Sequence, residues 1–152
     1  MRTPSLISLL LAGSLILHSC GEYPCGKAET VFGLVGFSDL ESDSIIIRRF
    51  VKNSNFSSQL DTAILFPIRF RRVHDTLELV AFTGEAVLKS EYDYQLFFPR
   101  IPKLVSISKL EEEQRYGKKS GNKEYCMNRM ISCQVNDQPR NIIDFNPVYI
   151  PR

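Results

Sequence analysis

The chain has no tryptophan and only two histidines, and none of its apolar runs is long enough to cross a membrane as a helix. His18 lies in the N-terminal apolar segment, so His74 is the one imidazole in the remainder of the chain. A Ser-His-Asp or Cys-His site would have to use it. His74 lies among charged residues in "RRVHDT", which is typical of a solvated turn. We therefore expect no histidine-dependent catalysis.

An excess of charge of either sign is also missing. The 19 Lys and Arg side chains and 17 Asp and Glu side chains leave a formal net charge of +2. A nucleic-acid-binding domain of this size usually has a strongly basic face. The composition excludes nucleic acid as the expected partner, and no pattern of ligands indicates a metal or another cofactor.

The longest apolar run extends from Leu6 to Leu17, after a short polar start that contains Arg2. Twelve residues of helix rise about 18 Å, which is less than the roughly 30 Å of a bilayer core. A basic start followed by a short apolar helix is the pattern of a secretory signal. We predict that residues 1–19 form a signal helix that is cleaved from the mature protein.

The residues Leu17-His18-Ser19-Cys20 resemble the lipobox of bacterial lipoproteins. The resemblance implies cleavage before Cys20 and acylation of that cysteine, which would anchor the protein in membrane lipid. Gly21 stands where inner-membrane retention uses aspartate, so we expect the outer membrane, with the periplasmic face and the cell surface both open. The alternative is an ordinary signal peptide cut near Ser19, which would leave Cys20 to form a disulfide.

Three further cysteines remain, namely Cys25, Cys126 and Cys133. An odd number in an oxidising compartment permits one internal bridge and leaves one thiol. Six residues separate Cys126 from Cys133, and we predict that these two are bonded. The alternatives are a bond from Cys25 to one of them, or a zinc site.

Short β-branched and aromatic runs separated by turn residues recur along the chain and favour strands. The runs are 30–37, 44–51, 62–72, 76–82, 92–98, 103–110, 130–135 and 142–150. The polar segment "EEEQRYGKKSGNKE" (111–124) reads as a loop, and "NDQPRN" (136–141) as a turn. We predict an all-β fold, an antiparallel immunoglobulin-like sandwich of about eight strands over residues 30–152. Residues 20–29 would be the lipidated cysteine and a tether, and a closed barrel is the alternative fold.

Several of these segments together resemble small lipoproteins of the Bacteroidota. They are "KNSNFSSQLDTAILF", "DTLEL", "YDYQLFFP", "KLVSISKLE" and the two cysteines six residues apart. The resemblance covers most of the mature chain and implies an immunoglobulin-like sandwich at the cell envelope. It carries no catalytic motif.

Three tripeptides have the same pattern, an Asp followed by a Ser or Thr and then by an aliphatic residue. Their hydroxyl residues are Ser44, Thr62 and Thr76. They resemble the acceptor motif of O-glycosylation in Bacteroidota. An Asx or Ser/Thr turn at the start of a strand has the same letters. We predict O-glycosylation at these residues, with the turn as the alternative.

Tyr92, Asp93 and Tyr94 combine aromatic rings with a carboxylate, as glycan-binding surfaces often do. We expect a non-enzymatic binding or accessory module, with an envelope protein or a glycan as its partner. The alternative is a small glycan-processing hydrolase that uses carboxylates alone, with Asp93 and Glu91 at its centre.

Overall fold

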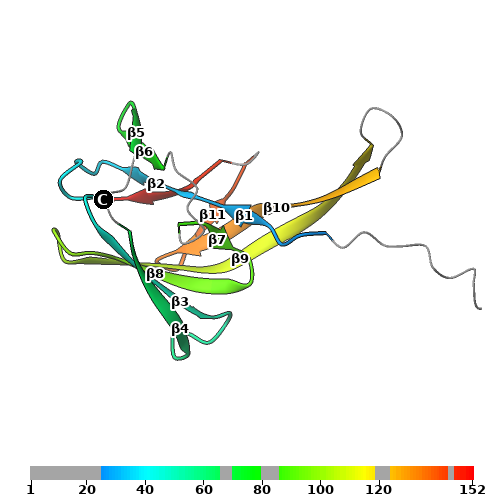
Figure 1. The fold of residues 1–152 in the computed structure, drawn as a ribbon, viewed down its shortest axis with the longest axis horizontal. Helices are drawn as coiled ribbons and strands as arrows, with labels where there is room; N and C mark the ends of the chain where they lie inside the picture. Colours follow the sequence, from blue (N-terminus) through cyan, green and yellow to red (C-terminus); the bar gives the residue numbers. More distant parts are fainter. Residues whose placement is uncertain (1–24, 66–69, 80–85, 119–123, 144–145) are drawn as a thin grey trace, which may run out of the picture.

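The computed structural model describes residues 25–65, 70–79, 86–118, 124–143 and 146–152 (Figure 1). The predicted signal helix and Cys20 lie outside the described residues. Within them the chain forms twelve strands and no helix, which confirms the all-β prediction, although with more strands than expected. The strands are β1 (Glu29–Thr30), β2 (Phe32–Val35), β3 (Ile45–Val51), β4 (Gln59–Leu65), β5 (Phe70–Val73), β6 (Thr76–Leu79), β7 (Leu88–Lys89), β8 (Tyr92–Phe98), β9 (Lys103–Lys118), β10 (Glu124–Val135), β11 (Gln138–Asn141) and β12 (Val148–Pro151).

The strands form two main sheets and one short pair. The larger sheet has the order β11-β10-β9-β8-β3-β4 and is antiparallel throughout. The smaller has the order β12-β2-β6-β5, in which β12 runs parallel to β2 and the other pairs are antiparallel. β1 pairs with β7. The buried side chains of both main sheets form one hydrophobic core.

The alternation along β8 accounts for one wall of this core. Tyr94, Leu96 and Phe98 are fully buried, whereas Gln95 and Phe97 between them are partly exposed. In an extended strand, alternate side chains point to opposite faces of the sheet. The predicted strand 92–98 is therefore confirmed, and Tyr94, Leu96 and Phe98 form its buried face.

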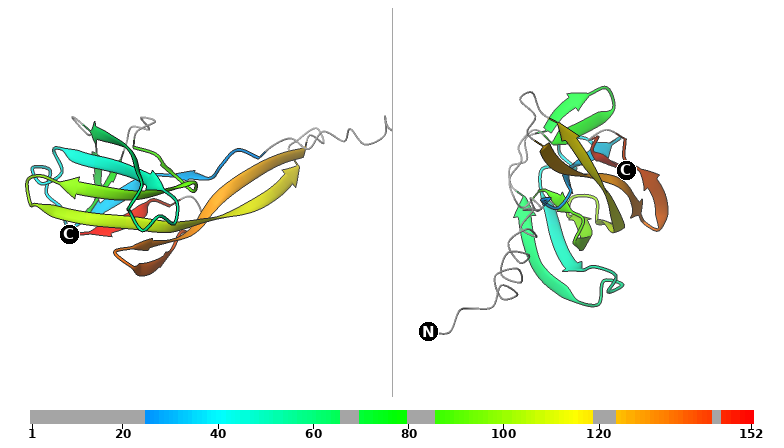
Figure 2. Two further views of the ribbon diagram at one scale, coloured as in Figure 1. Left: turned by 90° about the horizontal axis from the view of Figure 1, so that it is seen from below. Right: turned by 90° about the vertical axis from the view of Figure 1, so that its right-hand side faces the viewer.

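The prediction of a loop over 111–124 is wrong. β9 continues to Lys118, and β10 begins at Glu124, so most of this segment lies in a long two-stranded ladder (Figures 1 and 2). We call the outer part of this ladder, residues 113–118 of β9 and 124–130 of β10, the arm. Its strands are joined by backbone hydrogen bonds and by polar pairs such as Arg129 with Glu113 at 2.9 Å. The apolar alternation that marks a strand against a core is therefore missing.

A tight turn at Asn136 and Asp137 joins β10 to β11. Both residues have positive φ angles, 49° and 62°, as a two-residue hairpin turn of the primed type requires. The predicted turn over 136–141 is therefore correct at its first two residues, but residues 138–141 are a strand. The final strand is shorter than predicted, and it joins the smaller sheet.

Candidate functional site

The disulfide bond joins Cys25 to Cys126, with Cα atoms 5.2 Å apart and a sequence separation of 101 residues. The predicted bond between Cys126 and Cys133 does not form. Both residues lie on β10, where seven steps along an extended strand span about 23 Å. Bonded cysteines have Cα atoms within about 7 Å of each other. The alternative with Cys25 is the arrangement that the structure shows.

This disulfide lies toward the outer end of the arm, away from the sandwich. Cys126 is the ladder partner of Tyr116, two pairs from the terminal pair Lys118 and Glu124. The side-chain amide of Gln114 lies 2.9 Å from the Cys25 sulfur and 3.1 Å from the Cys126 sulfur, as a donor to both. The N-terminal end of the described chain is thus covalently joined to the arm.

Cys133 is the remaining thiol among the described residues, and it is buried in the core. Burial raises the pKa of the Cys133 thiol to about 11, and the nearby Arg140 guanidinium only partly opposes this. A reactive cysteine needs a lowered pKa and access to solvent. Cys133 therefore serves as a core side chain.

The predicted ligand surface at Tyr92, Asp93 and Tyr94 is not a surface. Tyr94 is fully buried, and its phenolic oxygen accepts a hydrogen bond from the Lys89 backbone N–H at 2.7 Å. Burial raises the pKa of Tyr94 to about 12. Only Tyr92 is partly exposed, with the Arg49 guanidinium 5.3 Å from its ring centroid. The alternation of the strand takes Tyr94 into the core.

Asp93 is 2% exposed, so it is not available as an active-site acid on the surface. One of its carboxylate oxygens accepts a hydrogen bond from the Asn53 backbone N–H at 2.8 Å. Asn53 belongs to the β3–β4 connection and has a positive φ of 60°. Asp93 therefore stabilises this connection against β8, and the sequence pattern that suggested a binding residue reflects a structural one.

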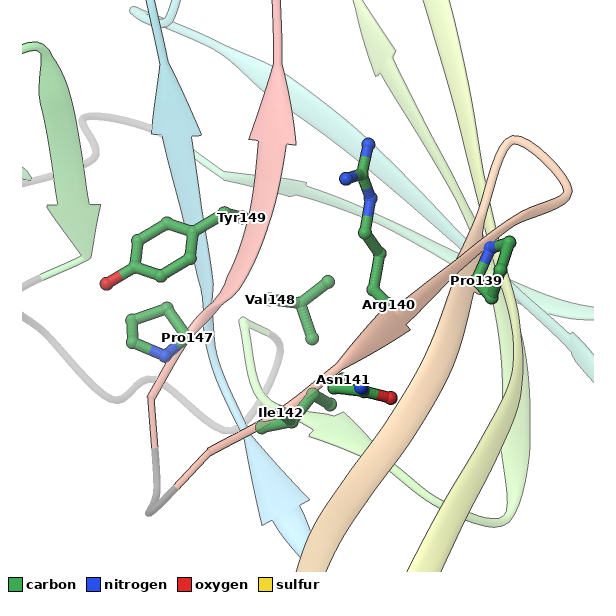
Figure 3. A pocket seen from close by; sticks show the side chains of 7 residues that line it. All are labelled: Pro139, Arg140, Asn141, Ile142, Pro147, Val148 and Tyr149. Atoms are coloured by element: carbon green, nitrogen blue, oxygen red, sulfur yellow. The ribbon is translucent and has the colours of Figure 1, made fainter.

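A groove lies between β11 and β12 (Figure 3). It has a volume of about 350 Å³ and is lined by Pro139, Arg140, Asn141, Ile142, Pro147, Val148 and Tyr149. Ile142 and Val148 are buried, whereas Pro139, Arg140 and Tyr149 are exposed. β11 and β12 are the last strands of their sheets, so the groove follows the open side of the sandwich.

Gly33 on β2 positions the aromatic ring of this groove. It is the ladder partner of Tyr149, and a Cβ atom at Gly33 would lie 3.0 Å from Cδ1 of that ring. Only glycine allows the ring to lie this close to the backbone of β2. The sequence reasoning missed Gly33 and Tyr149. The one signal for them was an aromatic residue between prolines in "NPVYIP".

The groove combines a tyrosine ring, two proline rings and the Arg140 guanidinium. Aromatic rings stack against sugar or peptide groups, and a guanidinium pairs with anions. Its lining has no carboxylate, thiol or imidazole, and its rings and guanidinium offer contacts for binding.

A second, more open hollow of about 580 Å³ includes two carboxylates, Glu41 and Asp75. Glu41 accepts a hydrogen bond from the Ser38 backbone N–H and pairs with Arg152 at 2.6 Å. Both contacts lower the pKa of Glu41, the Ser38 backbone hydrogen bond most. A general acid needs a raised pKa. Glu41 is therefore suited to its ion pair rather than to proton donation.

The three predicted glycosylation residues differ in access. Thr62 is exposed on β4, and Thr76 is half-buried on β6. Ser44 is buried, and its hydroxyl donates to the Asp43 carboxylate at 3.0 Å. Modification of Ser44 in the folded domain would require that contact to open, whereas Thr62 could carry a glycan without rearrangement of the core.

His74 is exposed between β5 and β6 with a positive φ of 52°, which confirms its assignment to a turn. In the described part of the chain, no three His, Cys, Asp or Glu side chains gather into a set that could bind a metal ion. The same residues contain no helix with the length and apolar character needed to span a membrane.

Comparison of the chain with protein families, with curated proteins and with solved structures gives no match.

Proposed function

We propose that this protein is a lipid-anchored module of the bacterial outer membrane that binds an envelope glycan or protein without catalysing a reaction. Residues 1–19 are its signal peptide, and Cys20 carries the lipid. The disulfide between Cys25 and Cys126 is the observation that carries the proposal. Disulfides of this kind persist in oxidising compartments, and this one lies five residues after the cysteine of the lipobox.

The groove between β11 and β12 is the proposed binding site. Its tyrosine ring is packed against Gly33, and the Arg140 side chain lies on the other side of Val148 (Figure 3). A concave surface with a few oriented polar groups and an aromatic ring supports recognition of a small or extended ligand. The immunoglobulin-like assignment of the sandwich belongs to this proposal, and the two packed sheets support it.

A glycan-processing hydrolase is the second candidate, because Glu41 and Asp75 line one hollow. Two carboxylates can hydrolyse a glycosidic bond when one of them is kept protonated. The lowered pKa of Glu41 opposes this role. Hydrolysis of a purified envelope polysaccharide that is lost in Glu41→Gln and in Asp75→Asn would favour the hydrolase over the binding module.

Metabolic labelling tests the anchor. Cells that express the full chain are grown with a radiolabelled or alkyne-bearing palmitate and then fractionated. The wild type should be labelled and remain in the outer-membrane fraction, whereas Cys20→Ala should be unlabelled. Cys25→Ala is the matched control and should keep the label. A wild-type chain without label would contradict the proposed function.

A titration tests the groove. The probe is a soluble muropeptide mixture from digested peptidoglycan, measured by calorimetry against the wild type and Tyr149→Ala. Loss of binding in Tyr149→Ala, with binding kept in Leu40→Ala, supports the groove as a glycan site. No heat from the wild type would exclude this glycan and leave a protein as the expected partner.

A further inference from the structure

The backbone of β12 offers few hydrogen-bond donors on the side of the groove. The N–H groups of Val148 and Arg152 donate to carbonyls at the two ends of the β2 segment, at 2.8 and 2.9 Å. Backbone groups along a strand point alternately to its two sides. Residues 147, 149 and 151 therefore face the open side, where the groove lies. Pro147 and Pro151 have no N–H, so Tyr149 supplies the one backbone donor among these three residues.

The facing edge of β11 has the same character. The Ile142 N–H donates to the Ile131 carbonyl beside β10 at 2.8 Å, and Arg140 is the ladder partner of Cys133. By the same alternation, the backbone groups of Pro139 and Asn141 point to the open side. Pro139 lacks an N–H, which leaves that of Asn141 as the donor within β11 on this side.

This arrangement disfavours a peptide that would add a strand in the groove. Strand addition needs alternating donors and acceptors along the edge that receives the peptide, and proline on an edge prevents such pairing. The groups that remain are mostly carbonyls, those of Pro139, Asn141, Pro147 and Tyr149. The Pro151 carbonyl already accepts a hydrogen bond from Lys103 Nζ at 2.9 Å. The edges of the groove therefore suit a ligand with many donors, such as the hydroxyl groups of a glycan.

Arg140 adds a positive charge to this lining. It is exposed, and its guanidinium has no ion-pair partner among the described residues. A guanidinium pairs well with a carboxylate, through two parallel hydrogen bonds. The Arg140 side chain and the Tyr149 ring lie on opposite sides of Val148 (Figure 3). A ligand that contacts both must extend across Val148, which requires more than one sugar ring.

We propose that the groove binds an acidic oligosaccharide. One sugar ring stacks on Tyr149, the hydroxyl groups donate to the edge carbonyls, and a carboxylate pairs with Arg140. The inference rests on the proposed function of the groove as the binding site. It narrows the ligand from a glycan or a protein to a glycan that carries carboxylate groups.

Calorimetry with the full-length protein tests the charge. The probes are oligogalacturonate, oligoguluronate and a hyaluronan hexasaccharide, and at least one should bind. Arg140→Gln should weaken that binding by at least about tenfold, because it removes a hydrogen-bonded charge pair. Arg48→Gln on β3 is the matched control, since the Arg48 guanidinium also has no ion-pair partner among the described residues. It should leave the affinity unchanged.

The ligand can be altered in the same way. The methyl ester of the bound probe keeps its sugar rings but loses its charge, so the wild type should bind it at least about tenfold more weakly. Arg140→Gln should bind the acid and the ester alike, because the two changes remove one interaction. An O-methylated probe that keeps its carboxylates should also bind more weakly, since it has lost the donors to the edge carbonyls.

Three results would overturn the inference. They are no binding of any acidic probe, equal binding of acid and ester by the wild type, and equal binding of the free and O-methylated probes. Reduced, carboxymethylated α-lactalbumin, an unfolded acidic protein, is titrated in parallel. If it alone binds, and Tyr149→Ala abolishes this, the ligand is a peptide and the proposed binding function stands. If neither this protein, the muropeptides nor the acidic probes bind, the groove is not a binding site and the proposed function fails as well.

Discussion

Tyr94 shows how a single buried hydroxyl contributes to this fold. Its oxygen accepts from the Lys89 backbone N–H at 2.7 Å, inside the core. Tyr94→Phe removes the acceptor and leaves the partly buried Lys89 N–H without it, which should cost about 1–3 kcal/mol of unfolding free energy. Urea unfolding measures this. Tyr116→Phe is the control and should change nothing, because Tyr116 is exposed.

Two buried acids should make the fold sensitive to alkali. Burial raises the pKa of Cys133 to about 11 and that of Tyr94 to about 12, from ordinary values of 9.0 and 10.0. As pH rises, the unfolded chain therefore loses these protons before the folded chain does. Between the ordinary pKa and the raised pKa of each group, the unfolded chain binds fewer protons than the folded chain. Stability should be unaffected below pH 9 and should fall from there to about pH 12. A Tyr94→Phe variant whose stability falls as steeply above pH 10 as that of the wild type would contradict this.

The number of thiols that react with a maleimide reports the state of the cysteines. Cys133 is buried, and Cys25 and Cys126 are bonded. The native protein should not react with a maleimide at pH 7, because a thiol with a raised pKa and no access is unreactive. In the mature protein with Cys20 acylated as proposed, one thiol should react in denaturant without reductant. Three reactive thiols would mean that the disulfide is absent.

At the scale of elements, the disulfide connects the N-terminal segment to the arm. Closing a loop of this length stabilises by up to about 4–5 kcal/mol in the chain-entropy description. Cys25→Ser should lower the melting temperature by roughly 10 °C or more, and Cys126→Ser should have the same effect. The double substitution should be no worse than either single one, since all three remove one bond. An unchanged melting temperature in Cys25→Ser would contradict the pairing.

Gly33 determines where Tyr149 lies in the groove. The added methyl group of Gly33→Ala would meet the Tyr149 ring at 3.0–3.1 Å. The ring must move by a few tenths of an ångström, so binding at the groove should weaken while the fold persists. Gly26→Ala is the control, because a Cβ atom there meets nothing within 4 Å. Calorimetry with the same probe measures the effect, and equal affinity in both variants would exclude Gly33 as a positioning residue.

Strands that contact the core could be predicted from the sequence, and strands that do not could not. The alternation of Tyr94, Leu96 and Phe98 indicates a strand because each second residue is buried. The arm has polar residues on both faces, and its ladder is formed by backbone groups that every sequence shares. The same limit applies to the disulfide. The short spacing in sequence favoured a bond between Cys126 and Cys133. The sequence did not show that both lie on one extended strand, which holds them apart.

The site was harder to predict than the fold. A tyrosine-rich strand suggested a binding surface at Tyr92 to Tyr94, but aromatic side chains are as common in a core as on a surface. The groove arises where the last strands of two sheets face each other, which is a property of topology. No local motif marks it, apart from the aromatic residue between two prolines.

At the scale of the whole molecule, the structure joins a sandwich to the segment that would follow a lipid anchor. The connection is covalent, through Cys25 and Cys126, and it lies at the arm rather than at the sandwich. A flexible tether would let the domain take any orientation over the membrane. A bonded segment of five residues restricts it, so the end with the C-terminus should be the part most accessible to envelope partners.

Peptide mass spectrometry of the membrane-extracted protein, digested with trypsin without reduction, tests this arrangement most directly. One peptide, Cys20–Lys27, contains the proposed lipidation site and Cys25, and another, Glu124–Arg129, contains Cys126. We predict a single species in which an acylated Cys20–Lys27 is disulfide-bonded to Glu124–Arg129. A Cys20–Lys27 peptide without lipid, or Glu124–Arg129 bonded to the peptide Met130–Arg140 that contains Cys133, would contradict it.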